Sequence, residues 1–176
     1  DNRNLRNVRN PFGGHKLYRN DNGKFTDVSA RAGIFGSEVG FGLGLAIADV
    51  NHDGWPDIYV SNDFFERDYL YVNNRDGTFV ESLEKAMRYS SYFSMGLDIA
   101  DIDNDGWPDI YTTDMLPDDE VRLKTTSSFD SWDVYQAKVR TGYGRQFMRN
   151  MLQHNNGDAS LRPGQTPTFS DIGQMA

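Results

Sequence analysis

Gly-Leu-Ala-Ile-Ala-Asp-Val-Asn-His-Asp-Gly-Trp-Pro-Asp-Ile-Tyr occupies residues 44–59, and Gly-Leu-Asp-Ile-Ala-Asp-Ile-Asp-Asn-Asp-Gly-Trp-Pro-Asp-Ile-Tyr occupies residues 96–111. The two copies lie 52 positions apart, as Asp49 and Asp101 show. In each copy an acidic segment lies between two apolar segments. A repeat at this interval predicts a small structural unit that the chain uses more than once.

A second element recurs outside the acidic loops. Leu-Tyr-Arg-Asn-Asp-Asn-Gly-Lys-Phe at 17–25 resembles Leu-Tyr-Val-Asn-Asn-Arg-Asp-Gly-Thr-Phe at 70–79, and a weaker copy begins with Leu-Gln-His-Asn-Asn-Gly at 152–157. Asp-Gly between β-rich runs is a strong hairpin signal. The pattern predicts four short strands near 43–48, 58–61, 69–73 and 78–81. Four strands in 40 to 50 residues is about the size of one β-propeller blade.

These repeats predict an all-β fold made of β-propeller blades, each with four antiparallel strands and a calcium-binding hairpin loop. Frequent glycine (17 residues) and aromatic residues (13%) suit short strands and tight turns better than a helical bundle. We expect residues 1–176 to be part of one propeller domain. It would hold a half blade at about 15–28, a blade at about 40–82 and a blade at about 93–172. That number of blades cannot close a ring, so the sequence predicts a partial propeller.

The stretch 117–149 interrupts the second blade. Trp132, Tyr135 and Val139 have helical spacing, Asp130 or Ser131 is placed to cap a helix, and Gly142 is placed to end it. We predict a helical insertion between the second and third strands of that blade. An irregular loop is the alternative.

The two acidic loops have the composition of a calcium site. Calcium takes six to eight oxygen ligands, and a compact loop supplies them when alternate side chains point inward and a glycine permits a sharp turn. Asp or Asn stands at positions 1, 3 and 5 of each loop, glycine at position 6 and Asp at position 9, and the carbonyl of position 7 is a further ligand. The predicted ligands of two Ca²⁺ ions are Asp49, Asn51, Asp53, Trp55 and Asp57, and Asp101, Asp103, Asp105, Trp107 and Asp109.

The EF-hand is the obvious competitor for such a loop, and the sequence argues against it. An EF-hand requires a bidentate Glu at position 12 and flanking helices. Position 12 is Val60 in the first loop and Thr112 in the second, and the flanks are strand-like. The first loop has Asn51 where the second has Asp103, so we expect the first loop to bind calcium more weakly.

The bulk composition excludes several other classes. The formal net charge of -8 argues against a nucleic-acid partner, and the absence of cysteine excludes disulfides and thiolate metal sites. No run of 18 apolar residues predicts a transmembrane helix, and no signal peptide is visible. The polar start at Asp1 is expected for the interior of a longer protein or for a mature form. The three histidines are scattered and predict no histidine metal site.

Together these motifs resemble the FG-GAP (VCBS-type) repeat of integrin α propellers and of bacterial surface proteins. Phe41-Gly42 matches the start of that motif and the loops 49–57 and 101–109 match its calcium site, although the Gly-Ala-Pro tripeptide is missing. Asp-Asn-Asp-Gly-Trp-Pro-Asp-Ile-Tyr at 103–111 is closer to a bacterial (Bacteroidetes) branch related to cartilage acidic protein. The resemblance implies a propeller, structural calcium and an exported protein.

We therefore expect a non-enzymatic, calcium-binding module that acts in protein or glycan interaction. Its location would be extracellular or cell-surface, on the outer-membrane or periplasmic side of a bacterium. The alternatives are a polysaccharide-degrading enzyme on a propeller frame and an accessory subunit of an outer-membrane complex. Aromatic residues of the insertion, with Tyr89, Tyr92 and Phe93, are either packing residues or a glycan or protein contact surface.

Overall fold

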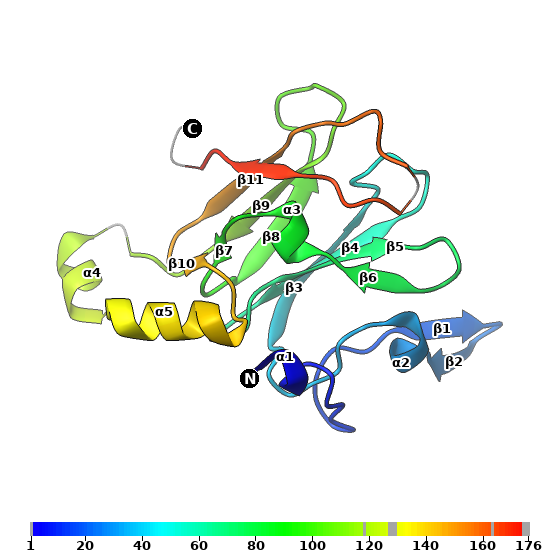
Figure 1. Cartoon of the computed structure of the whole chain (residues 1–176), viewed down its shortest axis with the longest axis horizontal. Coiled ribbons are helices and arrows are strands. Elements are labelled where there is room, and N and C mark those ends of the chain that lie inside the picture. The colour runs from blue at the N-terminus through cyan, green and yellow to red at the C-terminus, as the bar shows by residue number, and fades with distance from the viewer. Residues whose placement is uncertain (1, 118, 127–129, 163, 174–176) are drawn as a thin grey trace.

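Two four-stranded antiparallel sheets dominate the computed structural model, which describes residues 2–117, 119–126, 130–162 and 164–173 (Figure 1). In the first sheet the strands follow the chain order: β3 (Gly42–Ala48), β4 (Asp57–Asn62), β5 (Tyr69–Asn73) and β6 (Phe79–Glu81). The second sheet repeats that order with β8 (Gly96–Ala100), β9 (Asp109–Thr113), β11 (Met151–Asn155) and β12 (Phe169–Asp171). Each sheet is thus a meander of the kind that forms one propeller blade.

Smaller elements surround the two sheets. A hairpin of β1 (Tyr18–Asp21) and β2 (Lys24–Asp27) precedes the first sheet, and β7 (Ser90–Ser91) pairs in parallel with β10 (Gln146–Phe147). Three one-turn helices lie at α1 (Asn2–Leu5), α2 (Ser29–Ala32) and α3 (Leu83–Ala86). The helices α4 (Glu120–Thr126) and α5 (Trp132–Thr141) extend to one side of the sheets in Figure 1. No helix among the described residues has the length and apolarity needed to cross a membrane.

The strand β5 is buried along its whole length because both faces of the first sheet are covered. On one face Leu70 and Val72 pack with Tyr59 and Val50 and with Ile110 of the second sheet. On the other face Tyr69 and Tyr71 pack with residues near α2 and the first hairpin. Successive side chains of β5 point to opposite faces of the sheet, so this one strand contributes to two separate hydrophobic cores.

The predicted fold class is confirmed, and the predicted strands of the first blade differ from the observed ones by a residue at most. Asp76-Gly77 forms a tight turn, in which Gly77 has a φ of 82° and the amide of Asn74 donates to the carbonyl of Thr78 at 3.0 Å. The helix in the insertion is also confirmed. Ser131 caps it by accepting a hydrogen bond from the amide of Val134, and Gly142 ends it with a φ of 93°.

The insertion explains why the repeat interval is lost after the second loop. It separates β9 from β11, yet β11 still pairs with β9 as β5 pairs with β4. Tyr71 and Gln153 therefore hold equivalent places, since each lies opposite the isoleucine that follows a position-9 aspartate. The division of the chain into blades of one propeller domain stays a prediction.

Candidate metal centre

The acidic loops join the first two strands of each sheet, and the side chain at position 1 sets their shape. In the first loop Asp49 accepts hydrogen bonds from the amides of Asp53 (3.0 Å) and Gly54 (2.8 Å). In the second loop Asp101 accepts the equivalent bonds from Asp105 (3.1 Å) and Gly106 (2.9 Å). One carboxylate thus folds each loop back on itself, and the two loops have the same shape.

Positions 5 and 7 are tied to each other in both loops. The amide of Trp55 donates to Oδ1 of Asp53 at 2.9 Å, and the amide of Trp107 donates to Oδ1 of Asp105 at 2.8 Å. Trp107 also stacks on His52 of the first loop, with ring centroids 4.1 Å apart and planes 12° apart. The two loops are therefore neighbours in space, although they belong to different sheets.

The carboxylate at position 9 is buried and links its loop to the third strand. Asp57 accepts hydrogen bonds from the amides of Val50 (3.1 Å) and Asn73 (2.8 Å). Burial raises the pKa of Asp57 to about 6, against the lowering effect of these hydrogen bonds. Asp109 accepts equivalent bonds from Ile102 (3.1 Å) and Asn155 (2.7 Å). Position 9 is thus the point at which the loop is anchored in the sheet.

A left-handed backbone at two positions completes the turn. Gly54 and Gly106 at position 6 have φ of 85° and 93°, as a sharp turn requires. His52 and Asn104 at position 4 also have positive φ, 54° and 62°. The glycine was readable from the sequence. The positive φ at position 4 was not predicted, although histidine and asparagine are two of the residue types that adopt this conformation more often than most.

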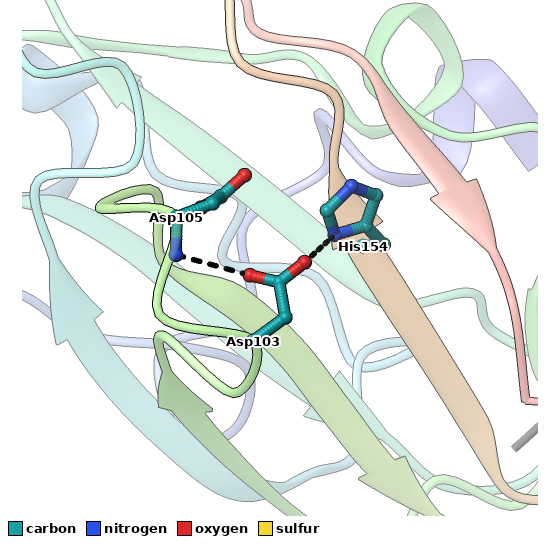
Figure 2. A group of neighbouring side chains, drawn as sticks. All are labelled: Asp103, Asp105 and His154. Carbon is teal, nitrogen blue, oxygen red and sulfur yellow. Dashed lines mark hydrogen bonds and ion pairs between the residues drawn. The ribbon is translucent and has the colours of Figure 1, made fainter.

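The acidic side chains lie closer together in the second loop than in the first. Ligand atoms of Asp101, Asp103 and Asp109 lie within 4.8 Å of one another, and those of Asp103, Asp105 and His154 do the same. His154 comes from β11, and its Nδ1 lies 3.1 Å from Oδ1 of Asp109. Figure 2 shows the same nitrogen pointing toward Oδ2 of Asp103, at 3.5 Å. The scattered histidines predicted no histidine metal site, yet the fold brings His154 to the acidic loop by a contact that spans the insertion.

The first loop is built differently at position 5. The carboxylate of Asp53 accepts from the amide of Gly164 at 2.8 Å and lies 3.5 Å from the guanidinium of Arg75. Burial raises the pKa of Asp53, but these contacts and the amide of Trp55 hold it below its ordinary value. Val72 stands where the second loop has His154. Among the described residues, no three acidic or histidine side chains of this loop meet within 4.8 Å.

All ten predicted ligand residues therefore lie in the two loops, in matching positions. Oxygen atoms of carboxylates and of one amide are the donors that a hard cation such as calcium prefers. The donor set fits calcium in both loops, with one carboxylate fewer in the first. The asparagines Asn73 and Asn155 were not among the predicted site residues, although both belong to the repeated Leu-x-x-Asn element of the sequence.

Comparison with known proteins agrees with this geometry. The chain is 32% identical to mouse integrin alpha-3 over 97 residues, 39% identical to human integrin alpha-7 over 82 residues and 33% identical to chicken integrin alpha-6 over 82 residues. These matches cover 48%, 40% and 40% of this chain and only 9%, 7% and 8% of the relatives, so the chain spans less than a tenth of their length. A model of the FG-GAP-like repeat matches residues 8–60 and 49–112, which is more than half of the chain. The chain therefore belongs to the FG-GAP-like repeat family.

Proposed function

We propose that this chain is part of an extracellular β-propeller whose two loops bind calcium and whose role is to hold an interaction surface. The observation that carries the proposal is the matching hydrogen-bond network of Asp49, Asp53 and Asp57 with Asp101, Asp105 and Asp109. Such repetition is expected when both loops serve the same cation. The similarity to integrin α chains supports an extracellular or cell-surface location.

Calcium would act as a structural ion here. Each loop joins the first two strands of a sheet, and its position-9 carboxylate reaches the third strand through Asn73 or Asn155. A bound ion would offset the repulsion between neighbouring carboxylates and so favour the folded loop. Because the unfolded chain lacks the site, binding stabilises the fold by RT ln(1 + [Ca²⁺]/Kd).

The carboxylates outside the loops support a role without catalysis. Buried Glu66 is paired with Arg6 at 2.7 Å, and Glu81 is paired with Arg67 at 2.6 Å. Buried Asp68 accepts hydrogen bonds from Tyr59 (2.8 Å) and Ser94 (3.1 Å). These groups are engaged in ion pairs and hydrogen bonds. The acidic residues that line the described cavities, Glu84, Asp130 and Asp171, are each paired with a cationic side chain. We therefore infer a binding module, exported by a bacterium of the branch that the Trp-Pro-Asp-Ile-Tyr motif resembles.

The test is a calcium titration of the purified chain after treatment with a chelator. We expect two bound ions, with one lost in Asp49→Asn and the other lost in Asp101→Asn. Asp133→Asn, which changes an exposed carboxylate of α5, serves as the control and should retain both. No binding by the wild-type chain at millimolar calcium would overturn the proposal.

A further inference from the structure

The insertion forms a cavity against the sheets that the calcium loops do not use. Its volume is about 600 Å³, within the usual range for small-ligand sites. The wall combines aromatic rings with polar groups: Tyr92, Trp132, Tyr135, Arg145, Gln146 and Phe147 line it. The residues that line this cavity come mainly from α5 and from the segment around β10. Figure 1 shows these two elements away from both acidic loops.

Three aromatic rings form a stack at this wall, with Trp132 at its exposed end. Trp132 stacks with Tyr135 at a centroid distance of 5.7 Å and an angle of 24°, and Tyr135 lies 5.9 Å from Phe147 at 33°. Trp132 is 70% exposed, and no residue of α5 is buried. The aromatic residues of the sheet cores, such as Tyr59, are almost fully buried. The helix therefore presents flat apolar surface to solvent instead of using it to pack.

Gln146 lines the same wall and carries a buried amide. Its Nε2 donates to the carbonyls of Phe65 (2.9 Å) and Tyr143 (3.1 Å), which fixes the orientation of the amide. Its Oε1 is buried and has no hydrogen-bond partner among the described residues. A buried acceptor without a donor is costly, so the wall favours a ligand that brings a hydroxyl or N–H group.

Cationic side chains lie next to the stacked aromatic rings. Arg145 and Val139 also line an adjoining cavity of about 900 Å³, which Lys85 and Arg88 line as well. Within the described part of the chain, the side chains of Lys85, Arg88 and Arg145 form no hydrogen bond or ion pair. Two other arginines of that wall, Arg67 and Arg149, are paired with Glu81 and Asp171. The acidic residues that line the two cavities, Glu84, Asp171 and Asp130, are paired with Arg67, Arg149 and Lys138. Lys85, Arg88 and Arg145 therefore leave an excess of positive charge in these walls, which favours an anion.

We propose that these two adjoining cavities bind an acidic oligosaccharide, a sugar chain that carries carboxylate groups. The C–H face of one pyranose ring would lie on the exposed face of Trp132, and its hydroxyl groups would approach the polar groups of the cavity wall. The carboxylate of a neighbouring sugar would lie by Arg145 and Arg88. This inference rests on the proposed role as an interaction module and gives that module a ligand class.

The test is an array of immobilised oligosaccharides that pairs uronate-containing chains with neutral chains of the same length, probed with the whole chain in calcium. We expect binding to the uronate-containing chains and a loss of at least tenfold in affinity for Trp132→Ala and for the double variant Arg88→Gln/Arg145→Gln. Higher salt should also weaken binding, since the contacts are ionic. Phe12→Ala, which removes an exposed aromatic ring outside both cavities, should bind like the wild type.

Two results would overturn the proposal: binding to neutral chains alone, or an array without signal. Preference for a polyglutamate peptide over every sugar would overturn it as well. Calcium titration of the same samples separates this inference from the proposed function. If the titration shows two bound calcium ions but the array gives no signal, only the proposed ligand is contradicted. If the chain binds uronate-containing sugars but the titration shows no bound calcium, only the proposed role of the loops is contradicted.

Discussion

The backbone amide of Asn155 donates a hydrogen bond to Oδ1 of Asp109, with the two atoms 2.7 Å apart across 46 residues of sequence. Asn73 makes the same bond to Asp57 at 2.8 Å in the first sheet. The side-chain amides of the two asparagines also make equivalent hydrogen bonds. Asn73 donates to the carbonyl of Pro56, and Asn155 donates to the carbonyl of Pro108. In each sheet the third strand therefore holds the loop between the first and second strands.

Replacing Asn155 with alanine should destabilise the fold. Its side-chain amide is buried and donates to the carbonyls of Pro108 (3.2 Å) and of Val50 in the first loop (2.9 Å). Loss of both bonds leaves buried carbonyls unpaired, so we expect a fall of about 2–4 kcal/mol in the free energy of unfolding by urea. The neighbour Asn156 is the control, because its side-chain hydrogen bonds with Thr168 and Ser170 are exposed to solvent, and Asn156→Ala should lower the free energy of unfolding by less than about 1 kcal/mol. Equal effects of the two variants would contradict this account.

Exchanging the residues at position 3 should exchange the calcium affinities of the loops. Asp103→Asn removes a carboxylate from the second loop, and Asn51→Asp adds one to the first. We expect the affinity of each altered loop to change at least tenfold, about 1.4 kcal/mol, down for Asp103→Asn and up for Asn51→Asp. Isothermal titration calorimetry resolves the two sites if their affinities differ. Unchanged affinities in both variants would show that position 3 does not ligate the ion.

Arg75 should weaken calcium binding by the first loop. Its guanidinium lies 3.5 Å from Oδ2 of Asp53, where it competes with a cation for the same carboxylate. Arg75→Gln should therefore raise the affinity of that loop several-fold and leave the second loop unchanged. A lower affinity in the variant would mean that Arg75 positions Asp53 for the ion.

His154 should support calcium binding by the second loop as an orienting residue. Its Nδ1 lies 3.1 Å from Oδ1 of Asp109, a group that is buried at position 9. Partners that orient a metal ligand are commonly worth about 10–100-fold in metal affinity. His154→Val, which copies Val72 of the first sheet, should lower the affinity of the second loop by about tenfold and spare the first. A tighter site in the variant would instead identify His154 as a competitor of the ion.

The buried carboxyl of Asp68 should make stability fall as the pH rises. Burial raises its pKa from 3.8 to about 7, although hydrogen bonds from Asn62, Tyr59 and Ser94 act in the opposite direction. Between these two pKa values the folded chain holds a proton that the unfolded chain has lost, so the free energy of unfolding decreases with rising pH and then levels off above about 7.

Asp68→Asn isolates this contribution. Urea unfolding of the variant and the wild type at several pH values should give curves that diverge between about pH 4 and 7, with the variant gaining relative stability. Parallel curves would show that Asp68 does not hold the proton.

The sequence was sufficient for the parts of the fold that local pattern controls. Alternation and the Asp76-Gly77 turn determine the strands and the hairpin of the first sheet, and the spacing of Trp132, Tyr135 and Val139 determines a helix. The repeat at 52 positions also located both loops. Each of these signals lies within a few residues of the structure that it predicts.

Contacts between residues on opposite sides of the insertion could not be predicted from local sequence patterns. His154 meets Asp109 across 45 residues, and Gly164 meets Asp53 across 111. The short parallel pair of β7 and β10 likewise joins Ser90 to Gln146, and two-residue strands leave no periodicity to detect. Pairings of this kind depend on how the sheets and the insertion pack, which no local pattern encodes.

Thermal unfolding with and without calcium tests the central claim most directly. The chain is melted in 2 mM CaCl₂ and in EGTA, with MgCl₂ as a control for general divalent screening, and the double variant Asp57→Asn/Asp109→Asn is melted alongside. We predict a Tm higher by about 5 °C or more in calcium for the wild type, because ions bound only by the folded state stabilise it. The double variant should show no such shift. A wild-type Tm that is the same in calcium and in EGTA would contradict the claim that these loops are structural calcium sites.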